Sequence, residues 1–379
     1  MPDLTPSKSF KFIRNVKAYL KNGPTRELAP EETRSSPSPR ETAPEREGQD
    51  LRREAPTNNP QVFFIIGGGK SGTTWLKRLL NTHPEILCLG EGRIFNREWG
   101  RDDFRHLEVK VPPRSLYGAL SGSEDLRLWA QRSIWGRDED VEKHIDNLTR
   151  LAIDYFLQQR LSKTQKRIVG DKTPFLVGSN VLEEIQRIYP GAKVIHMIRD
   201  GRDVEISMLH HRWKNSMDRG GPHVLKPEEE ERRKAHENGD LQKLAEIGWF
   251  DEDELRRRAG LWGSQVAGAV KDGPELLGDN YTEVTYEGLL ENAEVQVGRL
   301  VSFLGASSDE KIVRRCVRKA SFEKLSQGRE RGQEDPTSFF RKGVAGDWKN
   351  VFSEKDKQIF KEEAGSILVK LGYEADNDW

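Results

Sequence analysis

Lysine and hydroxyl residues that directly follow an apolar run and three glycines are the strongest chemical signal in this sequence. Residues 62–66 are all apolar, residues 67–69 are all glycine, and Lys70 begins the run Lys70, Ser71, Gly72, Thr73 and Thr74. A buried strand, a Gly-rich turn and a helix N-terminus in this order bind anions. Backbone N–H groups and the helix dipole point at the ligand, and the lysine adds a full charge. The segment therefore predicts a phosphate-binding loop.

The loop differs from the one that binds nucleoside triphosphates. That motif, G-x-x-x-x-G-K-[ST], needs a glycine where this chain has Phe64. We expect Phe64 to belong to the strand, and the shorter loop to hold one phosphate rather than two in a row. An ATP- and Mg²⁺-dependent small-molecule kinase remains the enzyme alternative. Asp200, after an apolar strand, suits Mg²⁺ in such a kinase, but Arg199 before it suits an anion better.

Two other places in the chain carry anion-binding side chains. Arg199 ends an apolar run at 194–198, and Ser207 follows eight residues later, so both could grip one phosphate. Arg341 and Lys342 precede Gly343 in a glycine-containing segment near the C-terminus. Alone, this segment would be a surface turn. With the other two sites, it predicts a nucleotide that carries phosphates at two separate positions.

Strands and helices alternate along the part of the chain that contains these residues. Apolar runs at 62–66, 86–89 and 194–198 predict strands, residues 168–174 fit a strand that runs into a loop, and residues 283–286 fit one more strand. Apolar periodicity predicts helices after 73, at 146–161, at 181–188, after 199 and at 289–304. This order predicts an α/β fold with a parallel β-sheet flanked by helices on both faces. Ligands of such sheets bind at the carboxyl ends of the strands, where Lys70 and Arg199 fall.

Composition narrows the class of protein. The 379 residues have zero formal net charge and 33% charged residues, so no overall attraction to nucleic acid is expected. No apolar run reaches membrane-spanning length and no secretory leader is recognisable, from which we expect a cytoplasmic protein. Cys88 and Cys316 are expected to be reduced thiols. No metal-ligand cluster is recognisable among the eight histidines, and no metal is expected.

The first 58 residues differ from the rest. Residues 23–59 are rich in Pro, Glu, Arg, Ser and Thr, which predicts disorder. Residues 9–21 fit a basic amphipathic helix that could contact a membrane or a protein partner, or pack on its own domain. Residues 59–379 are expected to form one domain. Its stretch at about 214–258 is highly charged, which indicates a solvated helical insertion or a mobile cap over a cleft.

The three anion-binding segments resemble the signature segments of the sulfotransferase family that uses 3′-phosphoadenylyl sulfate (PAPS) as donor. They stand in family order across residues 62–352. The resemblance implies a P-loop nucleoside-triphosphate-hydrolase-like sulfotransferase fold. It implies that the 5′-phosphosulfate is held by Lys70, Ser71, Gly72, Thr73 and Thr74. It implies that the 3′-phosphate is held by Arg199, Ser207, Arg341, Lys342 and Gly343.

The resemblance also implies how adenine is bound. Trp75 matches the family position that stacks on the base, and Phe322 resembles the phenylalanine that completes the sandwich. Ala320 replaces the threonine of that Thr-Ser-Phe segment, which removes one hydrogen bond to the base. Tyr286 begins a segment similar to the family's Tyr-Glu-Asp, with Gly288 in place of the aspartate.

Sulfuryl transfer needs a general base and charge stabilisation at the leaving phosphate, and Lys70 suits the second role. Family members that sulfonate phenols and steroids carry a histidine base where this chain has Pro174. Residues 171–174 instead resemble the Glu-Lys-Thr-Pro segment of heparan-type carbohydrate sulfotransferases. That likeness implies Glu91 as the base, with Lys172 beside it. His106 is the rival base, and a surface carboxylate paired with Arg93 is the structural alternative for Glu91.

The implied reaction moves a sulfuryl group from PAPS to a hydroxyl of a carbohydrate, glycolipid or small-molecule acceptor without a metal. A non-catalytic nucleotide-binding regulatory protein is the remaining alternative, although Lys70 and a plausible base argue against it. His196 is expected to be a satisfied core residue, and no role is assigned to His210 or His211. The family's cytosolic dimer segment is not matched at Ser353 and Glu354, so that dimer is not expected.

Overall fold

The computed structural model describes residues 60–96, 115–133, 140–173, 179–216, 219–221 and 223–379, which belong to the compact unit Asn58–Trp379. The expected N-terminal helix, the tail, His106 and Pro174 lie outside the described residues.

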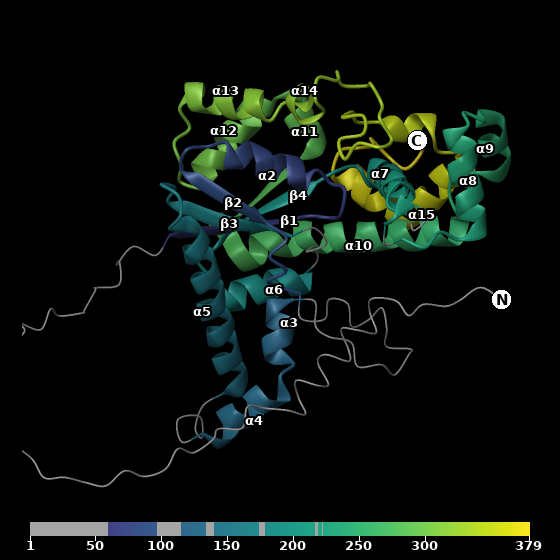
Figure 1. Ribbon diagram of the computed structural model, residues 1–379. Helices are drawn as coiled ribbons and strands as arrows, with labels where there is room; N and C mark the ends of the chain where they lie inside the picture. Colours follow the sequence, from purple (N-terminus) through teal and green to yellow (C-terminus); the bar gives the residue numbers. More distant parts are fainter. Residues whose placement is uncertain (1–59, 97–114, 134–139, 174–178, 217–218, 222) are drawn as a thin grey trace, which may run out of the picture. The chain divides into compact units, whose positions relative to one another are not determined.

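A five-stranded parallel sheet forms the centre of this unit (Figure 1). Its order is β2 (Ile86–Gly90), β3 (Ile168–Lys172), β1 (Gln61–Ile66), β4 (Lys193–Ile198) and β5 (Tyr281–Thr285). The α/β prediction is confirmed, and Phe64 lies inside β1 as expected. The fifth strand begins two residues earlier than predicted. It ends at Thr285 because this side chain accepts a hydrogen bond from Gly288 N–H and caps the next helix.

Helices cover both faces of the sheet (Figure 1). One face packs against α2 (Thr73–Asn81), α12 (Ala293–Phe303) and α13 (Glu310–Lys319), and the other against α5 (Val141–Leu161), α6 (Ser179–Ile188) and α10 (Glu252–Leu277). Side chains alternate along β1, so Phe63 and Ile65 join the first core while Val62, Phe64 and Ile66 join the second. Burial on both faces explains why residues 62–66 of β1 are a continuous apolar run.

A third core lies beside the sheet and supports the loops at its carboxyl edge. It joins α7 (Gly201–Lys214), α10 and α15 (Glu354–Lys370). The guanidinium of buried Arg202 lies between the rings of Trp348 and Trp379, 3.7 and 4.3 Å from their centroids. It is also paired with Asp200 and Glu374 at 2.7 and 2.5 Å. These contacts fix the last residues of the chain against the start of α7.

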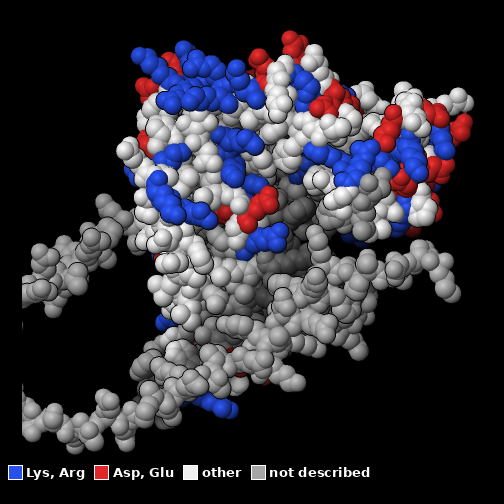
Figure 2. Space-filling model, viewed as in Figure 1, with Lys and Arg blue, Asp and Glu red and all other residues white. Residues whose placement is uncertain are grey.

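The charged stretch at 214–258 is only partly an insertion. It contains α8 (Pro227–Glu237) and α9 (Leu241–Ile247), but its last residues form the first turns of α10. Asp251 caps that helix, so the acidic residues after it complement the helix dipole. Arg212 of α7 pairs with Glu229 of α8 at 2.9 Å and with Glu254 of α10 at 2.5 Å. These ion pairs connect α8 and α10 to α7. Figure 2 shows both charge signs interspersed over α8 and α9.

Other helices also differ from expectation, since α10, α13 and α15 were not predicted from the sequence. The single helix expected at 289–304 is two helices, α11 (Tyr286–Glu291) and α12, separated at Asn292, whose backbone (φ −138°, ψ 58°) is not helical. A smaller bundle of α3 (Leu116–Ser121) and α4 (Glu124–Arg132) packs on α5. None of the helices in the described ranges is long and apolar enough to span a bilayer.

Candidate active site

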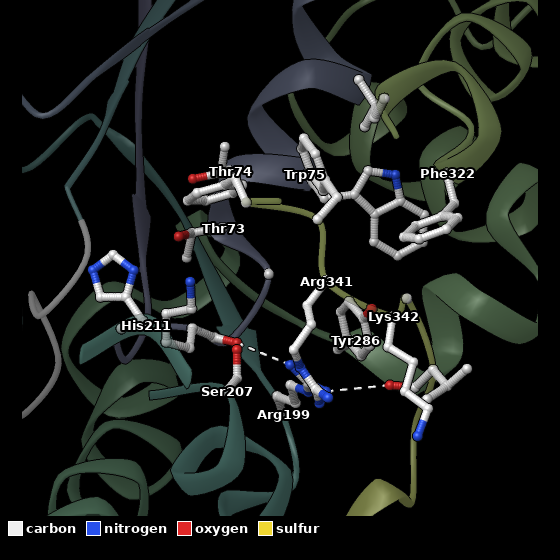
Figure 3. A pocket seen from close by; sticks show the side chains of 18 of the residues that line it. Thr73, Thr74, Trp75, Arg199, Ser207, His211, Tyr286, Phe322, Arg341 and Lys342 are labelled. Carbon is white, nitrogen blue, oxygen red and sulfur yellow. Dashed lines mark hydrogen bonds between the residues drawn. The ribbon is translucent and has the colours of Figure 1, made fainter. Parts of the chain in front are cut away.

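A cavity of about 390 Å³ lies at the carboxyl edge of the sheet (Figure 3). Every side chain or glycine that the sequence indicated for donor binding or catalysis lines it, except Ser71. These residues come from the turns after β1 to β4, from α7 and α11, and from the loop at 322–344: Lys70, Gly72, Thr73, Thr74, Trp75, Glu91, Lys172, Arg199, Ser207, Tyr286, Phe322, Arg341, Lys342 and Gly343. Ser71 is buried beneath the loop, where its N–H bonds Gly68 O at 3.2 Å.

The turn between β1 and α2 has the backbone that an anion-binding loop requires. Lys70 and Gly72 both have positive φ (68° and 96°), and Thr73 and Thr74 begin α2 directly afterwards. A Cβ on Gly72 would approach the Tyr286 ring to 2.7 Å, so only glycine fits there. The helix N-terminus and its free N–H groups therefore face the cavity.

Lys70 provides the cavity with a cation whose protonation is sensitive to its surroundings. Burial, followed by repulsion from Arg199, Lys214 and Arg341, lowers the pKa of Lys70 to about 8. Its ammonium lies 4.6 Å from the centroid of the Phe339 ring. An anion bound among these cations would reverse the repulsion and favour the charged lysine.

Arg199 leaves one donor available for an anion. Its guanidinium donates to Lys70 O and Val344 O, both at 3.2 Å, and lies 4.3 Å from the Tyr286 ring centroid. Its Nε is buried and has no hydrogen-bond partner among the described residues. A buried unpaired N–H is costly, and an anion in the cavity would satisfy it.

Two buried aspartates hold the basic loop that contains Arg341 and Lys342. Asp347 pairs with Arg341 and Lys342 at 2.7 and 2.6 Å. Although burial favours its neutral form, the hydrogen bonds from Lys342 and Arg341 lower the pKa of Asp347 to about 2. Asp203 of α7 accepts hydrogen bonds from the N–H groups of Gly346 and Trp348 at 2.7 and 3.0 Å. The two basic side chains are thus oriented before any ligand binds.

The same loop is shaped by Gly343 and by Arg329. Gly343 has φ 69°, and a Cβ there would lie 2.4 Å from the Phe322 ring. Arg329 donates to Gln333 O, Phe340 O and Arg341 O at 2.8, 2.6 and 2.7 Å. One guanidinium therefore organises the turn that presents Arg341 and Lys342.

Aromatic rings line the end of the cavity nearest to α2 and α14 (Phe322–Leu325). Trp75 donates from Nε1 to Ala320 O at 2.9 Å and packs edge-on against Tyr286 with centroids 5.5 Å apart. Figure 3 shows the rings of Trp75 and Phe322 beside each other at this end of the cavity. The carbonyl of Ala320 is used to fix Trp75, whatever side chain stands at that position.

Glu91 follows β2 on a turn with a left-handed backbone. Its φ is 61° and its N–H donates to Lys172 O at 2.6 Å. Its side chain is 60% exposed, whereas that of Lys172 is 3% exposed. The Lys172 ammonium lies 3.3 Å from both Glu91 Oε1 and Thr74 Oγ1, which joins the carboxylate to the phosphate-binding loop.

Asp171 fixes this turn from below. It accepts hydrogen bonds from Gly92 N–H at 3.1 Å and from Thr173 Oγ1 at 2.7 Å, and burial raises its pKa. Arg93 N–H donates in turn to Thr173 Oγ1 at 3.2 Å. A non-glycine residue with positive φ persists only where its surroundings hold it, as they do at Glu91.

Some lining residues were not anticipated from the sequence: Met208, His211, Leu290, Arg331, Phe339 and Phe340. His211 lies at the opposite end of the cavity from Trp75 and Phe322 (Figure 3). Burial, Lys70, His223 and Lys214 lower its pKa to about 4, and its Nδ1 contacts Asn215 Nδ2 at 3.1 Å. The sequence did contain a signal that His211 would line the cavity. It follows Ser207 by four residues, and residues at this spacing share one face of a helix.

Other histidines also differ from expectation. His196 is buried in β4, where Nδ1 contacts Tyr281 Oη at 2.7 Å, but Nε2 has no partner among the described residues, so it is only half satisfied. His210 and His236 lie together with Glu334. These three are far apart in sequence, and no spacing rule could have grouped them.

A family model described as "Sulfotransferase domain" matches residues 60–366. Among curated proteins, protein-tyrosine sulfotransferase A of Caenorhabditis elegans is 25% identical over 277 residues, covering 72% of this chain and 57% of the worm protein. Sulfotransferase 6B1 of Homo sapiens is 29% identical over 196 residues, covering 48% of this chain and 55% of that protein. The chain thus spans just over half the length of these relatives.

Among solved structures, the chain is similar to mouse sulfotransferase SULT7A1 complexed with PAP. That similarity has a TM-score of 0.46 and 16% identity, and it covers 83% of this chain and 87% of the mouse chain. A sulfotransferase from Alicyclobacillus acidocaldarius gives a TM-score of 0.41 at 17% identity, covering 83% of this chain and 95% of the bacterial one.

Proposed function

The chain belongs to the PAPS-dependent sulfotransferase family, and we propose that it transfers a sulfuryl group from PAPS to a hydroxyl of a carbohydrate, glycolipid or small-molecule acceptor. One observation carries this proposal: Lys70 and Arg341 line the same cavity as Arg199, whose buried Nε–H has no hydrogen-bond partner among the described residues.

The residues present fit a nucleotide with phosphates at two positions. Lys70, Thr73, Thr74 and the N-terminus of α2 would hold the 5′-phosphosulfate, and Lys342 and Gly343 would hold the 3′-phosphate together with Arg199, Ser207 and Arg341. Trp75, Phe322 and Tyr286 would surround the adenine. Bound PAPS supplies an activated sulfuryl group whose leaving group is a stable phosphate.

Lys70 is the group placed to stabilise charge at the leaving phosphate. In its protonated form it would neutralise negative charge that develops on the bridging oxygen as the S–O bond breaks. Preorganised donors of this kind are typically worth about 3 kcal/mol each. Thr74 and Lys172 extend the same polar chain, because Lys172 Nζ lies 3.3 Å from Thr74 Oγ1. No step of this scheme needs a metal ion.

Glu91 would act as the general base. The acceptor oxygen forms a bond to sulfur while its proton passes to the Glu91 carboxylate, and the products are a sulfate ester and 3′,5′-diphosphoadenosine (PAP). Lys172, 3.3 Å from Glu91 Oε1, would hold the carboxylate in position. The exposure of Glu91 supports this role, because a base must be reachable by the acceptor.

The acceptor class rests on the likeness of the segment Asp171–Thr173 to carbohydrate sulfotransferases. A peptide tyrosine hydroxyl is the second candidate, since the worm relative is named a protein-tyrosine sulfotransferase. Phe339, Phe340 and His211 at the cavity wall would suit an aromatic acceptor. Parallel PAPS assays with oligosaccharides, glycolipids, phenols and an acidic tyrosine peptide would separate these classes.

The first experiment measures nucleotide binding by calorimetry. We expect PAP to bind tightly without metal and Arg199→Ala to weaken it by about 10–100-fold, because a charged hydrogen bond is lost. ADP with Mg²⁺ is the matched competitor. If ADP with Mg²⁺ bound better than PAP, the kinase alternative would replace this proposal. Binding of PAP without transfer to any acceptor, and without hydrolysis of PAPS, would instead favour a regulatory protein.

A further inference from the structure

Two histidines and one glutamate converge beside the nucleotide cavity, although they come from three separate segments. His210 lies on α7, His236 lies on α8, and Glu334 lies in the loop that leads to Arg341. One ligand atom from each lies within 4.8 Å of the others. His210 is buried, His236 is half-buried and Glu334 is at the surface, so the group is open on one side.

The two imidazoles are held by packing rather than by hydrogen bonds. Their rings are 5.0 Å apart, and Trp249 packs against His236 edge-on at 5.4 Å. Trp213 contacts both rings, each at 5.4 Å. Within the described ranges neither imidazole has a hydrogen-bond partner. Imidazole nitrogens that are fixed in place and not otherwise engaged are available as ligands.

The charges around this group are balanced. Arg341 pairs with Glu334 at 2.6 Å and with Asp347 at 2.7 Å, and Lys342 pairs with Asp347 at 2.6 Å. Glu334 therefore contacts the basic loop through Arg341 and also lies beside the two histidines. The carboxylate of Glu334 could bind either to Arg341 or to a ligand held by the histidines, because its side chain is 31% exposed and has room to rotate.

We propose that His210, His236 and Glu334 form a binding site for a divalent transition-metal ion of the zinc type. Two imidazole nitrogens and one carboxylate oxygen are a donor set that suits Zn²⁺, and solvent would fill the fourth position. Small side-chain rotations would bring atoms already within 4.8 Å to coordinating distance. The site lies outside the sulfuryl-transfer machinery, so its role is to fix α8 and the 334 loop against α7.

Glu334 belongs both to the metal site and to an ion pair with Arg341, so it links metal binding to nucleotide binding. This link rests on the proposed function. A 3′-phosphate that engages Arg341 would release Glu334 from its ion pair. The released carboxylate would then complete the metal site. Because linkage is reciprocal, bound metal would also free Arg341 for the phosphate. Metal and PAP should therefore bind with positive cooperativity.

The test of the site uses the full chain, stripped with a chelator, and no nucleotide. Calorimetric titration with Zn²⁺ should show one site per chain, and Co²⁺ should give the visible absorption of a four-coordinate complex. His236→Phe keeps the aromatic packing but removes the ligand, and Glu334→Gln removes the charge. Each should weaken Zn²⁺ by about tenfold or more, whereas Glu330→Gln, an exposed control, should not.

The possible results test the metal site, the sharing of Glu334 and the proposed function separately. Absence of Zn²⁺ binding, or equal binding by both variants, overturns the metal site whether or not the protein transfers sulfuryl groups. Repeating the titration with saturating PAP should tighten Zn²⁺ by about fivefold or more. An unchanged Zn²⁺ affinity in protein that demonstrably binds PAP overturns the sharing of Glu334. Failure of PAP itself to bind counts against the proposed function instead.

Discussion

The two ends of the cavity are built in opposite ways. At the phosphate end, Arg199, Arg341 and Lys342 are each paired with a buried aspartate. Asp203 also accepts a hydrogen bond from Gly346 N–H, which fixes the loop that contains Arg341 and Lys342. At the reacting end, Glu91 stands on a left-handed turn, is 60% exposed and is joined by one ion pair to Lys172. The side chains proposed to bind the nucleotide are therefore preorganised. The proposed base, by contrast, is open to solvent.

Removing the base should separate the two ends most strongly. Glu91→Gln keeps the size of the side chain but cannot accept the acceptor's proton, so turnover should fall by about 10²–10⁴-fold. PAP affinity should stay unchanged, because no phosphate ligand is touched. Steady-state rates and calorimetry on the same preparation check both. Loss of PAP binding together with turnover would show that Glu91 supports the turn rather than the chemistry.

Crowding the phosphate end should have the next largest effect. In Gly343→Ala the added Cβ would lie 2.4 Å from Phe322, and overpacking of about 1–3 kcal/mol should lower PAP affinity by about 10–100-fold. Gly346→Ala is the matched control in the same loop. It has φ 77°, close to the 69° of Gly343, but nothing lies within 4 Å of its added Cβ. Equal losses in both variants would mean that backbone strain alone, not contact with the adenine side, matters.

The pH dependence of donor binding tests the electrostatics of the loop. The pKa of Lys70 is lowered to about 8 in the free protein, so its charge is present below pH 8 and is lost as pH rises through this value. PAP affinity should fall by about tenfold between pH 7 and pH 9.5. Lys70→Arg stays charged over this range and should bind PAP with a much flatter profile. A flat profile for the unaltered protein would contradict the assigned role of Lys70.

The smallest effect is expected for a residue that supports the phosphate end from outside the cavity. Tyr373 donates to Glu287 Oε2 at 2.9 Å, and Glu287 in turn accepts from Asp200 N–H at 3.2 Å. Tyr373→Phe should cost about 1 kcal/mol of unfolding free energy. It should leave turnover and PAP affinity within about twofold. Thermal melts and PAP titration check this, and a larger loss of affinity would place the C-terminal segment within the binding site.

Most of the sheet and the donor end could be predicted from local sequence. The runs at 62–66 and 194–198, followed by glycine and by arginine, mark β1 and β4 and their turns, because strands buried on both faces contain few polar residues. The break at Asn292 was missed because it depends on a backbone angle rather than on periodicity. The helices α10, α13 and α15 were not predicted from the sequence.

The rest of the cavity wall could be predicted less well. Phe339, Phe340 and Arg331 reach the cavity through a loop without periodicity, and only the fold brings them to Lys70 and Trp75. The same holds for His210, His236 and Glu334, whose approach depends on how α8 packs on α7. Sequence spacing predicts neighbours within one element, whereas contacts between elements depend on tertiary packing.

The long reach of the contacts around Asp203 also has a consequence for biosynthesis. Its partners Gly346 and Trp348 follow it by 143 and 145 residues, and the Trp75 indole bonds a carbonyl 245 residues away. Contacts of such separation form slowly, because large loops must close first. The phosphate site cannot be complete until the segment around residue 348 has left the ribosome. Nascent chains therefore carry the glycine-rich turn and its lysine for most of their synthesis before they can retain a nucleotide.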